Sequence, residues 1–158
     1  MPSVVSYHRP ATIDEAAILL AAGNARAVGG GTVAVPDART SRDLGVQVVD
    51  LQALGLDAIG VADENSGADG RLRVGAMAPI GRLIDDERVP ALLRDLARRE
   101  LPSTLRYQAT VGGLVAGRWH ESALLAGLLV HDAVVELHGA ESLALTDYLA
   151  AGPGPHLI

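Results

Sequence analysis

The sequence predicts a domain of mixed helices and strands, built as one unit or as two small lobes that share a core. Two glycine clusters and the order of the apolar segments support this prediction. The clusters are Gly29-Gly30-Gly31-Thr32 and Thr110-Val111-Gly112-Gly113, and each follows a β-like apolar stretch. A chain of 158 residues, 49% of them hydrophobic, is long enough to bury a core.

The composition argues against several classes of function. A formal net charge of −6 argues against nucleic acid or an anionic membrane as a partner. Every basic residue is arginine, so the lysine of a P-loop is absent. The absence of cysteine removes disulfides, thiolate metal sites and iron–sulfur ligation. The longest apolar run, 123–130, is too short to span a bilayer, and no secretory signal is visible, so we expect a cytoplasmic protein.

The first third of the chain predicts a strand, a helix and a second strand. Val4–His8 alternates like a short strand. Thr12 and Glu15 have the spacing of a capping box, which opens a helix that closes at Gly23. Ala25–Val28 is the next strand and runs into the first glycine cluster. The three elements form a βαβ-like unit with an N–H-rich turn at its edge.

The middle of the chain alternates strands with helices. Strands are predicted at 46–51, 58–61 and 72–75, and the polar cluster 63–70 joins the last two in a hairpin. Helices follow at 80–84 and 89–101. The second helix has one apolar face and one charged, solvated face. These faces consist of Leu92, Leu93, Leu96 and Ala97, and of Arg94, Asp95, Arg98, Arg99 and Glu100.

The last third predicts a buried helix, two strands and a final helical turn. The helix at 123–130 starts near Ser122 and is apolar all round, so we expect it to be buried. Segments 133–137 and 143–145 read as strands that turn at Gly139, and Thr146 is a candidate cap for the last turn.

The two glycine clusters are candidate anion sites. Glycine tolerates positive φ, so consecutive N–H groups can converge on one anion. Two such loops, about eighty residues apart, could hold the two phosphates of a dinucleotide if the fold brings them together. The alternative is that the glycines only form tight turns. A Rossmann fingerprint is absent, because Val33-Ala34-Val35 follows Thr32.

Several motifs occur in an order that resembles a known family. Tyr7–Ala16 matches an opening pattern Y-x-x-P-x-S/T-x-x-E-A, residues 29–32 stand at a first phosphate loop, and residues 108–113 stand at a second. Shorter matches are Val49-Asp50-Leu51, Arg73-Val74-Gly75-Ala76 and Leu105-Arg106. Together they resemble the FAD-binding region of the flavin subunit of molybdenum hydroxylases, the xanthine dehydrogenase and carbon monoxide dehydrogenase medium-subunit family. The resemblance covers nearly the whole chain.

The resemblance implies a two-lobed α+β fold of the vanillyl-oxidase (PCMH) type, with lobes at 1–55 and 56–158 and without the family's C-terminal covering domain. FAD would lie extended in the cleft, with its pyrophosphate against the N–H groups of both loops. We expect Gly30→Val and Gly112→Val each to abolish binding and leave the fold intact. The implied cofactor-binding residues are Val28, Gly29, Gly30, Gly31, Thr32, Val33, Ala109, Thr110, Val111, Gly112, Gly113 and Leu114.

In that family the flavin relays electrons from iron–sulfur clusters in a partner chain to NAD or another acceptor. The resemblance therefore implies a flavin-dependent oxidoreductase subunit with molybdenum-cofactor and iron–sulfur partners, and with no catalytic or metal-ligating residue of its own. The absence of cysteine fits, because the clusters would then reside in a partner. Two copies could also pair through uncovered clefts.

Departures from the family pattern support a second hypothesis. Val33, Leu114 and Ala123 stand where the family has polar residues, and 117–121 replaces a small-residue segment. Each lost hydrogen bond would cost about 0.5–1.5 kcal/mol of binding. The alternative function is a degenerate member of the fold that has lost the flavin and acts as a scaffold or interaction module.

Other polar residues have simpler interpretations. The histidines at 8, 120, 131 and 138 lack the spacing of a helical zinc motif, so surface or capping roles are expected. Trp119 is either a packing anchor or a stacking partner for adenine. Arg106 and Arg118 could contact phosphate or pair with surface carboxylates. Ser122 lacks the context of a serine nucleophile.

Overall fold

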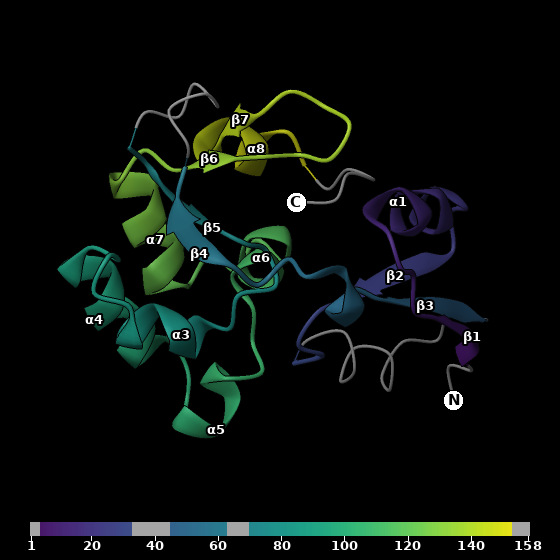
Figure 1. Cartoon of the computed structure of the whole chain (residues 1–158), viewed down its shortest axis with the longest axis horizontal. Coiled ribbons are helices and arrows are strands. Elements are labelled where there is room, and N and C mark those ends of the chain that lie inside the picture. The colour runs from purple at the N-terminus through teal and green to yellow at the C-terminus, as the bar shows by residue number, and fades with distance from the viewer. Residues whose placement is uncertain (1–3, 33–44, 63–69, 153–158) are drawn as a thin grey trace.

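The computed structural model describes residues 4–32, 45–62 and 70–152 (Figure 1). Its elements form two groups, a small sheet with one helix and a larger group that contains every element after Leu54. Among the described residues, no helix has the length and apolar character that a bilayer span requires.

Three parallel strands build the first group. They are β1 (Val4–His8), β2 (Ala25–Val28) and β3 (Val46–Asp50). Both β1 and β2 pair with β3, so the order across the sheet is β1-β3-β2. The predicted unit of strand, helix and strand is present, but β3 lies between its two strands. Local pattern could not reveal this insertion, because β3 pairs with strands distant in sequence.

Helix α1 (Ile13–Ala21) connects β1 to β2 and covers the sheet. Its predicted N-cap is confirmed, since the Thr12 hydroxyl accepts the Glu15 N–H at 3.2 Å. Ala16 and Val49 are both fully buried and pack together, with α1 and strand side chains around them. This small cluster is the core of the first group.

A buried carboxylate ties β1 to the end of β3. Asp50 is 6% exposed, and its Oδ2 accepts a hydrogen bond from the Tyr7 hydroxyl. Its Oδ1 accepts the N–H of Gln52 at 2.9 Å. Gln52 opens the short 3₁₀ turn η1 (Gln52–Leu54), which leads out of the sheet. Asp50 therefore fixes the chain where it leaves the sheet.

The second group combines two antiparallel hairpins with helices. The first hairpin pairs β4 with β5, and the second pairs β6 with β7. The elements are β4 (Ile59–Val61), β5 (Leu72–Val74), α3 (Ile80–Asp85), α4 (Ala91–Glu100), α5 (Ser103–Arg106), α6 (Val111–Ala116), α7 (Ala123–Val130), β6 (Val134–Val135), β7 (Leu143–Ala144) and α8 (Leu145–Ala150).

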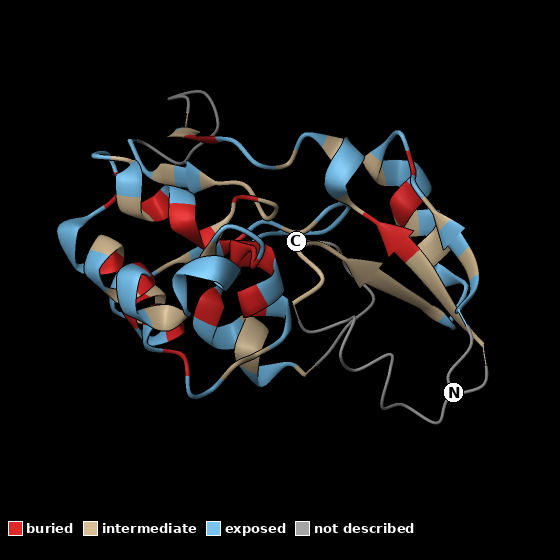
Figure 2. Ribbon diagram, turned by 90° about the horizontal axis from the view of Figure 1, so that it is seen from below, coloured by how far each residue is buried: buried red, intermediate tan, exposed pale blue. Residues whose placement is uncertain are grey.

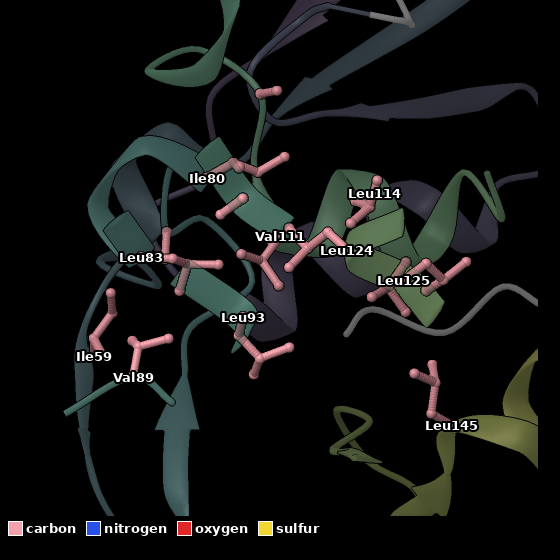
Figure 3. Close-up of a cluster of buried hydrophobic side chains, with 14 of the residues drawn as sticks. Ile59, Ile80, Leu83, Val89, Leu93, Val111, Leu114, Leu124, Leu125 and Leu145 are labelled. Carbon is pink, nitrogen blue, oxygen red and sulfur yellow. The ribbon is translucent and has the colours of Figure 1, made fainter. Parts of the chain in front are cut away.

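The main hydrophobic core lies in this second group. It runs from Ile59 to Leu145 and draws on α3, α4, α6 and α7, as Figure 3 shows. Leu124 and Ile80 are fully buried at its centre. Gly127 lets α7 approach α4, because a Cβ there would lie 2.5 Å from Leu96 Cδ1. Buried positions accordingly concentrate on the inward faces of these helices (Figure 2).

The structure differs from the sequence predictions in four helices. Helices α5 and α6 were not anticipated, and α6 begins at the second glycine cluster. Thr146 is not a cap, because α8 begins at Leu145 after Ala144. Helix α7 is not buried all round, since Val130 is 73% exposed. Its uniformly apolar sequence did not indicate which side faces water.

The two groups meet where the glycine clusters lie. A Cβ on Gly30 would lie 1.6 Å from the carbonyl oxygen of Gln108, and one on Gly29 would lie 3.0 Å from Thr110 Oγ1. Within the second group, a Cβ on Gly112 would lie 2.7 Å from the carbonyl oxygen of Ala76. These glycines are required for backbone contact, because any side chain would separate the segments.

We expect Gly30→Ala and Gly112→Ala each to lower the free energy of unfolding by about 1–3 kcal/mol, because a methyl group has no space against backbone. For Gly112→Ala, the direction of the change in unfolding free energy is informative, because alanine favours a helix over glycine by about 1 kcal/mol where space allows. Urea denaturation measures the change, and Gly60→Ala is the control because no atom lies within 4 Å of its added Cβ. A stabilised Gly112→Ala protein would contradict the packing shown.

We expect Tyr7→Phe to change the alkaline titration of the protein. The hydrogen bond to Asp50, followed by lost hydration and the Asp50 charge, raises the pKa of Tyr7. The neutral form is thus favoured on folding, so its stabilisation is complete below about pH 10 and is lost as pH rises through the raised pKa. The variant should lose the latest component of the ultraviolet tyrosinate titration.

Tyr107→Phe is the control for this titration, because the Tyr107 hydroxyl donates to the exposed Asp85 carboxylate at 3.2 Å. Urea denaturation above pH 10 provides a second measurement, in which stability should fall less steeply for Tyr7→Phe than for the unaltered protein. If Tyr7→Phe and the unaltered protein have the same tyrosinate titration and the same loss of stability above pH 10, the Tyr7–Asp50 interaction is refuted.

Candidate functional site

The first glycine loop lies at the carboxyl edge of the parallel sheet. β2 ends at Val28, whose carbonyl accepts the N–H of Leu51 at 3.0 Å, and the loop follows directly. In open parallel sheets, ligands bind outside this edge, where the chain leaves the strands. The βαβ-like prediction placed the loop after the second strand, and in the structure the loop follows the carboxyl end of β2.

The N–H groups of this loop lack protein acceptors within the described ranges. Residues Gly29 to Thr32 are all half-buried, and none of their N–H groups donates to an acceptor among the described residues. Gly31 has a φ of +71°, which turns the chain within the loop. Half-buried N–H groups require acceptors from water or a ligand. Successive N–H groups around such a turn form an anion-binding concavity.

The second loop is different, because its N–H groups already have partners in the protein. Val111 N–H donates to Ala78 O at 3.0 Å, and Gly112 N–H donates to Ala76 O at 2.7 Å. Gly113 N–H donates to Thr110 Oγ1 at 3.1 Å. Leu114 N–H donates to the carbonyl of Thr110, as in a regular first helical turn. The backbone donors left for a ligand thus belong to the first loop.

Thr110 supplies the polar group of the second loop. It is the N-cap of α6, is 6% exposed, and its hydroxyl lies against Gly29. A hydroxyl that accepts one hydrogen bond still has its own proton to donate. The fold therefore brings the two glycine loops together and adds one hydroxyl to the four backbone donors.

The remaining predicted site residues occupy several environments. Ala109, Val111 and Leu114 are buried in the main core, so their side chains pack against apolar neighbours. Val28 ends β2, and Gly113 is exposed in the first turn of α6. Val33 lies outside the described residues.

The expected effect of valine substitutions requires correction. Gly30→Val and Gly112→Val cannot leave the fold intact, because a Cβ at either position overlaps backbone atoms of another segment. Sequence reasoning attributed these glycines to ligand contact alone. In the structure, the lack of a side chain at each of these glycines allows two backbone segments to lie in direct contact.

The Arg118 side chain contacts groups of the protein itself. Its guanidinium donates to the carbonyls of Leu149 (2.6 Å) and Gly152, and it lies 4.9 Å from the centre of the Tyr148 ring. Its backbone has a φ of +51°. The side chain thus holds the end of α8 in place, and the expected surface carboxylate is not its partner.

Trp119 packs against the main core, which agrees with its interpretation as a packing anchor. Three of the described histidines make separate contacts, with His8 at Ser6 Oγ, His131 at Gly127 O and His138 at Asp14 Oδ1. Within the described ranges, no three residues of metal-ligating type come together. Ser122 caps α7 by accepting the Leu125 N–H at 2.9 Å.

The donor set fits a pyrophosphate. The N–H groups of four half-buried residues and the Thr110 hydroxyl could donate to a doubly charged, oxygen-rich group without any lysine. The glycine backbone lacks side chains that would keep such a group away from the N–H groups. This chemistry agrees with the dinucleotide cofactor that the sequence implied.

Comparison with known proteins also indicates a dinucleotide cofactor. Residues 3–155 match the family model described as the FAD binding domain in molybdopterin dehydrogenase. The uncharacterized protein YgfM of Escherichia coli K12 is 33% identical over 150 residues, which are 93% of this chain and 54% of YgfM. The chain thus spans about half the length of the curated relatives it matches.

Solved structures confirm the predicted fold. Reconstituted CO dehydrogenase from Oligotropha carboxidovorans superposes with a TM-score of 0.85 at 26% identity, over 99% of this chain and 58% of that one. A cyanide-inactivated Cu,Mo-CO dehydrogenase gives 0.84 at 27% identity, with the same coverage. Quinoline 2-oxidoreductase from Pseudomonas putida 86 gives 0.80 at 25% identity, over 92% and 52%. The chain therefore belongs to the family of FAD-binding domains of molybdopterin dehydrogenases.

Proposed function

We propose that this chain holds the pyrophosphate of FAD with the N–H groups of Gly29 to Thr32 and with the hydroxyl of Thr110. The observation that carries the proposal is a row of four N–H groups, in four half-buried residues, without acceptors among the described residues. The family description supports FAD as the ligand, and the position at the carboxyl edge of a parallel sheet supports the site.

The second loop has a different part in this proposal. Its residues Val111 to Leu114 keep their internal hydrogen bonds. Its contact with Gly29 and Gly30 shapes the first glycine loop, residues 29–32, which is called the donor loop below. Thr110 is the exception, because its hydroxyl can accept from Gly113 and donate to a phosphate oxygen at the same time. Bound FAD supplies the redox chemistry, and the protein supplies position and electrostatics.

At the level of the whole protein, we propose a flavin-carrying part of a molybdenum-hydroxylase-type oxidoreductase. It would pass electrons between iron–sulfur clusters of a partner and an acceptor. The similar solved structures are named as molybdenum CO dehydrogenase and quinoline oxidoreductase, which supports this class. The absence of cysteine supports a partner as the holder of the clusters.

We also propose that residues 1–55 and 56–158 are the two lobes around the cofactor. Two separate hydrophobic clusters support the division. One is centred on Ala16 and Val49, and the other begins at Ile59.

The proposal predicts that FAD binds better than shorter flavins. We expect saturable quenching of flavin fluorescence by the purified protein, with FAD binding at least about tenfold more tightly than FMN. The reason is that FMN lacks the pyrophosphate to which the N–H groups of the donor loop would bind. Inorganic pyrophosphate should compete with FAD. A colourless protein that ignores millimolar FAD would instead support a scaffold that has lost the flavin.

Thr110→Val tests the contribution of the second loop. Loss of a hydrogen bond to a charged phosphate should weaken FAD binding by about ten- to a hundredfold. Loss of the N-cap should also lower the unfolding free energy by about 0.5–2 kcal/mol. Fluorescence titration and urea denaturation measure the two effects separately.

Two matched variants separate binding from stability. Thr12→Val removes the N-cap of α1 in the same way, so it should lose stability and keep FAD affinity. Thr110→Ser keeps the hydroxyl and should restore most of the binding. If Thr110→Val binds FAD as tightly as Thr12→Val does, Thr110 does not contact the cofactor.

A further inference from the structure

Gln52 contacts the donor loop from the end of the neighbouring strand. Its side-chain Nε2 donates to the carbonyl oxygen of Gly29 at 3.4 Å. Gln52 is the first residue of η1, directly after β3 and Leu51. Its side chain is thus the polar group that reaches from the middle strand to the loop after β2.

The backbone of Gln52 is itself held by a buried group. Asp50 Oδ1 accepts the Gln52 N–H at 2.9 Å, and Asp50 Oδ2 accepts the Tyr7 hydroxyl. Leu51 N–H donates to Val28 O at 3.0 Å, which joins the same two chain segments one residue earlier. Continuous hydrogen bonds therefore run from Tyr7 through Asp50 and Gln52 to Gly29.

The bond to Gly29 has a consequence one residue later. The carbonyl of Gly29 and the N–H of Gly30 belong to one planar peptide unit, in which they point in opposite directions. A carbonyl turned toward Gln52 therefore turns the Gly30 N–H away from Gln52. This unit has glycine on both sides, so no side chain of its own limits its rotation. The Gln108 carbonyl packs against Gly30, and the bond from Gln52 adds a second restraint on the orientation of the unit.

We propose that Gln52 is a positioning residue for the anion site, which fixes the Gly29–Gly30 peptide so that the Gly30 N–H faces the ligand. It acts through Gly29 and touches no ligand itself. The inference rests on the proposed function, because the ligand in question is the pyrophosphate of FAD. A bond of 3.4 Å lies at the long end for N–H···O, so the effect is a modest one.

The test compares Gln52→Met with Gln47→Met. Methionine has the length of glutamine but cannot donate a hydrogen bond. Gln47 is a matched control, because it lies at the opposite end of β3 and its Nε2 donates to Asn24 Oδ1 at 2.8 Å, away from the loop. We expect FAD and inorganic pyrophosphate to bind Gln52→Met about three- to tenfold more weakly, and Gln47→Met unchanged.

A second measurement separates positioning from general stability. In amide NMR spectra of the ligand-free protein, Gln52→Met should shift the Gly30 N–H signal, and added pyrophosphate should move that signal less than in the unaltered protein. Both methionine variants should unfold at the same temperature, as expected for changes at side chains that are exposed or half-buried. A merely structural role of Gln52 would lower stability and leave the pyrophosphate-induced shift of the Gly30 signal unchanged.

The outcomes separate this inference from the proposed function. If the unaltered protein binds FAD and Gln52→Met binds it equally, the inference is wrong and the FAD site stands. If pyrophosphate binds and depends on Gln52 while FAD does not bind, the positioning of the anion site by Gln52 stands, but FAD is not its ligand and the proposed function is wrong. If neither ligand binds the unaltered protein, both are wrong.

Discussion

The rest of this structure depends on a contact in which two backbones touch without a side chain between them. Gly30 lies against the Gln108 carbonyl, where even a methyl group would overlap an oxygen atom. This contact joins the parallel sheet to the helical group. It therefore sets how far the loop after β2 lies from the cap of α6. The donor loop and the Thr110 hydroxyl are neighbours because glycine permits that distance.

The two glycine clusters look alike in sequence but have different physical functions. In the first, the N–H groups of Gly29 to Thr32 have no acceptor among the described residues, so no protein acceptor in those ranges neutralises their partial positive charges. In the second, the N–H groups of Val111 to Leu114 are used inside the protein. One loop supplies donors, and the other supplies a rigid surface against which the donor loop is shaped.

Much of this arrangement follows from local sequence. The strands β1 and β2, the cap at Thr12 and both loops were predictable, because alternation, capping and glycine are short-range signals. Helix α6 was missed, because glycines at 112 and 113 each disfavour a helix by about 1 kcal/mol. Its core contacts through Val111 and Leu114 and its Thr110 cap outweigh that cost. Thr110 before an apolar stretch was the signal that could have revealed it.

Long-range contacts could not be predicted in the same way. Neither the insertion of β3 between β1 and β2 nor the partners of Arg118 follow from spacing, since both depend on segments distant in sequence. The same limit applies to Leu114, which sequence comparison counted as a hydrogen bond lost to the cofactor. Leu114 is 3% exposed within the main core, so its side chain contributes to the packing of α6 and not to the polar surface. A polar residue there would need a partner inside an apolar cluster, or else a different turn of the helix. The substitution thus reflects how α6 is packed, and it does not show that the anion site has been lost.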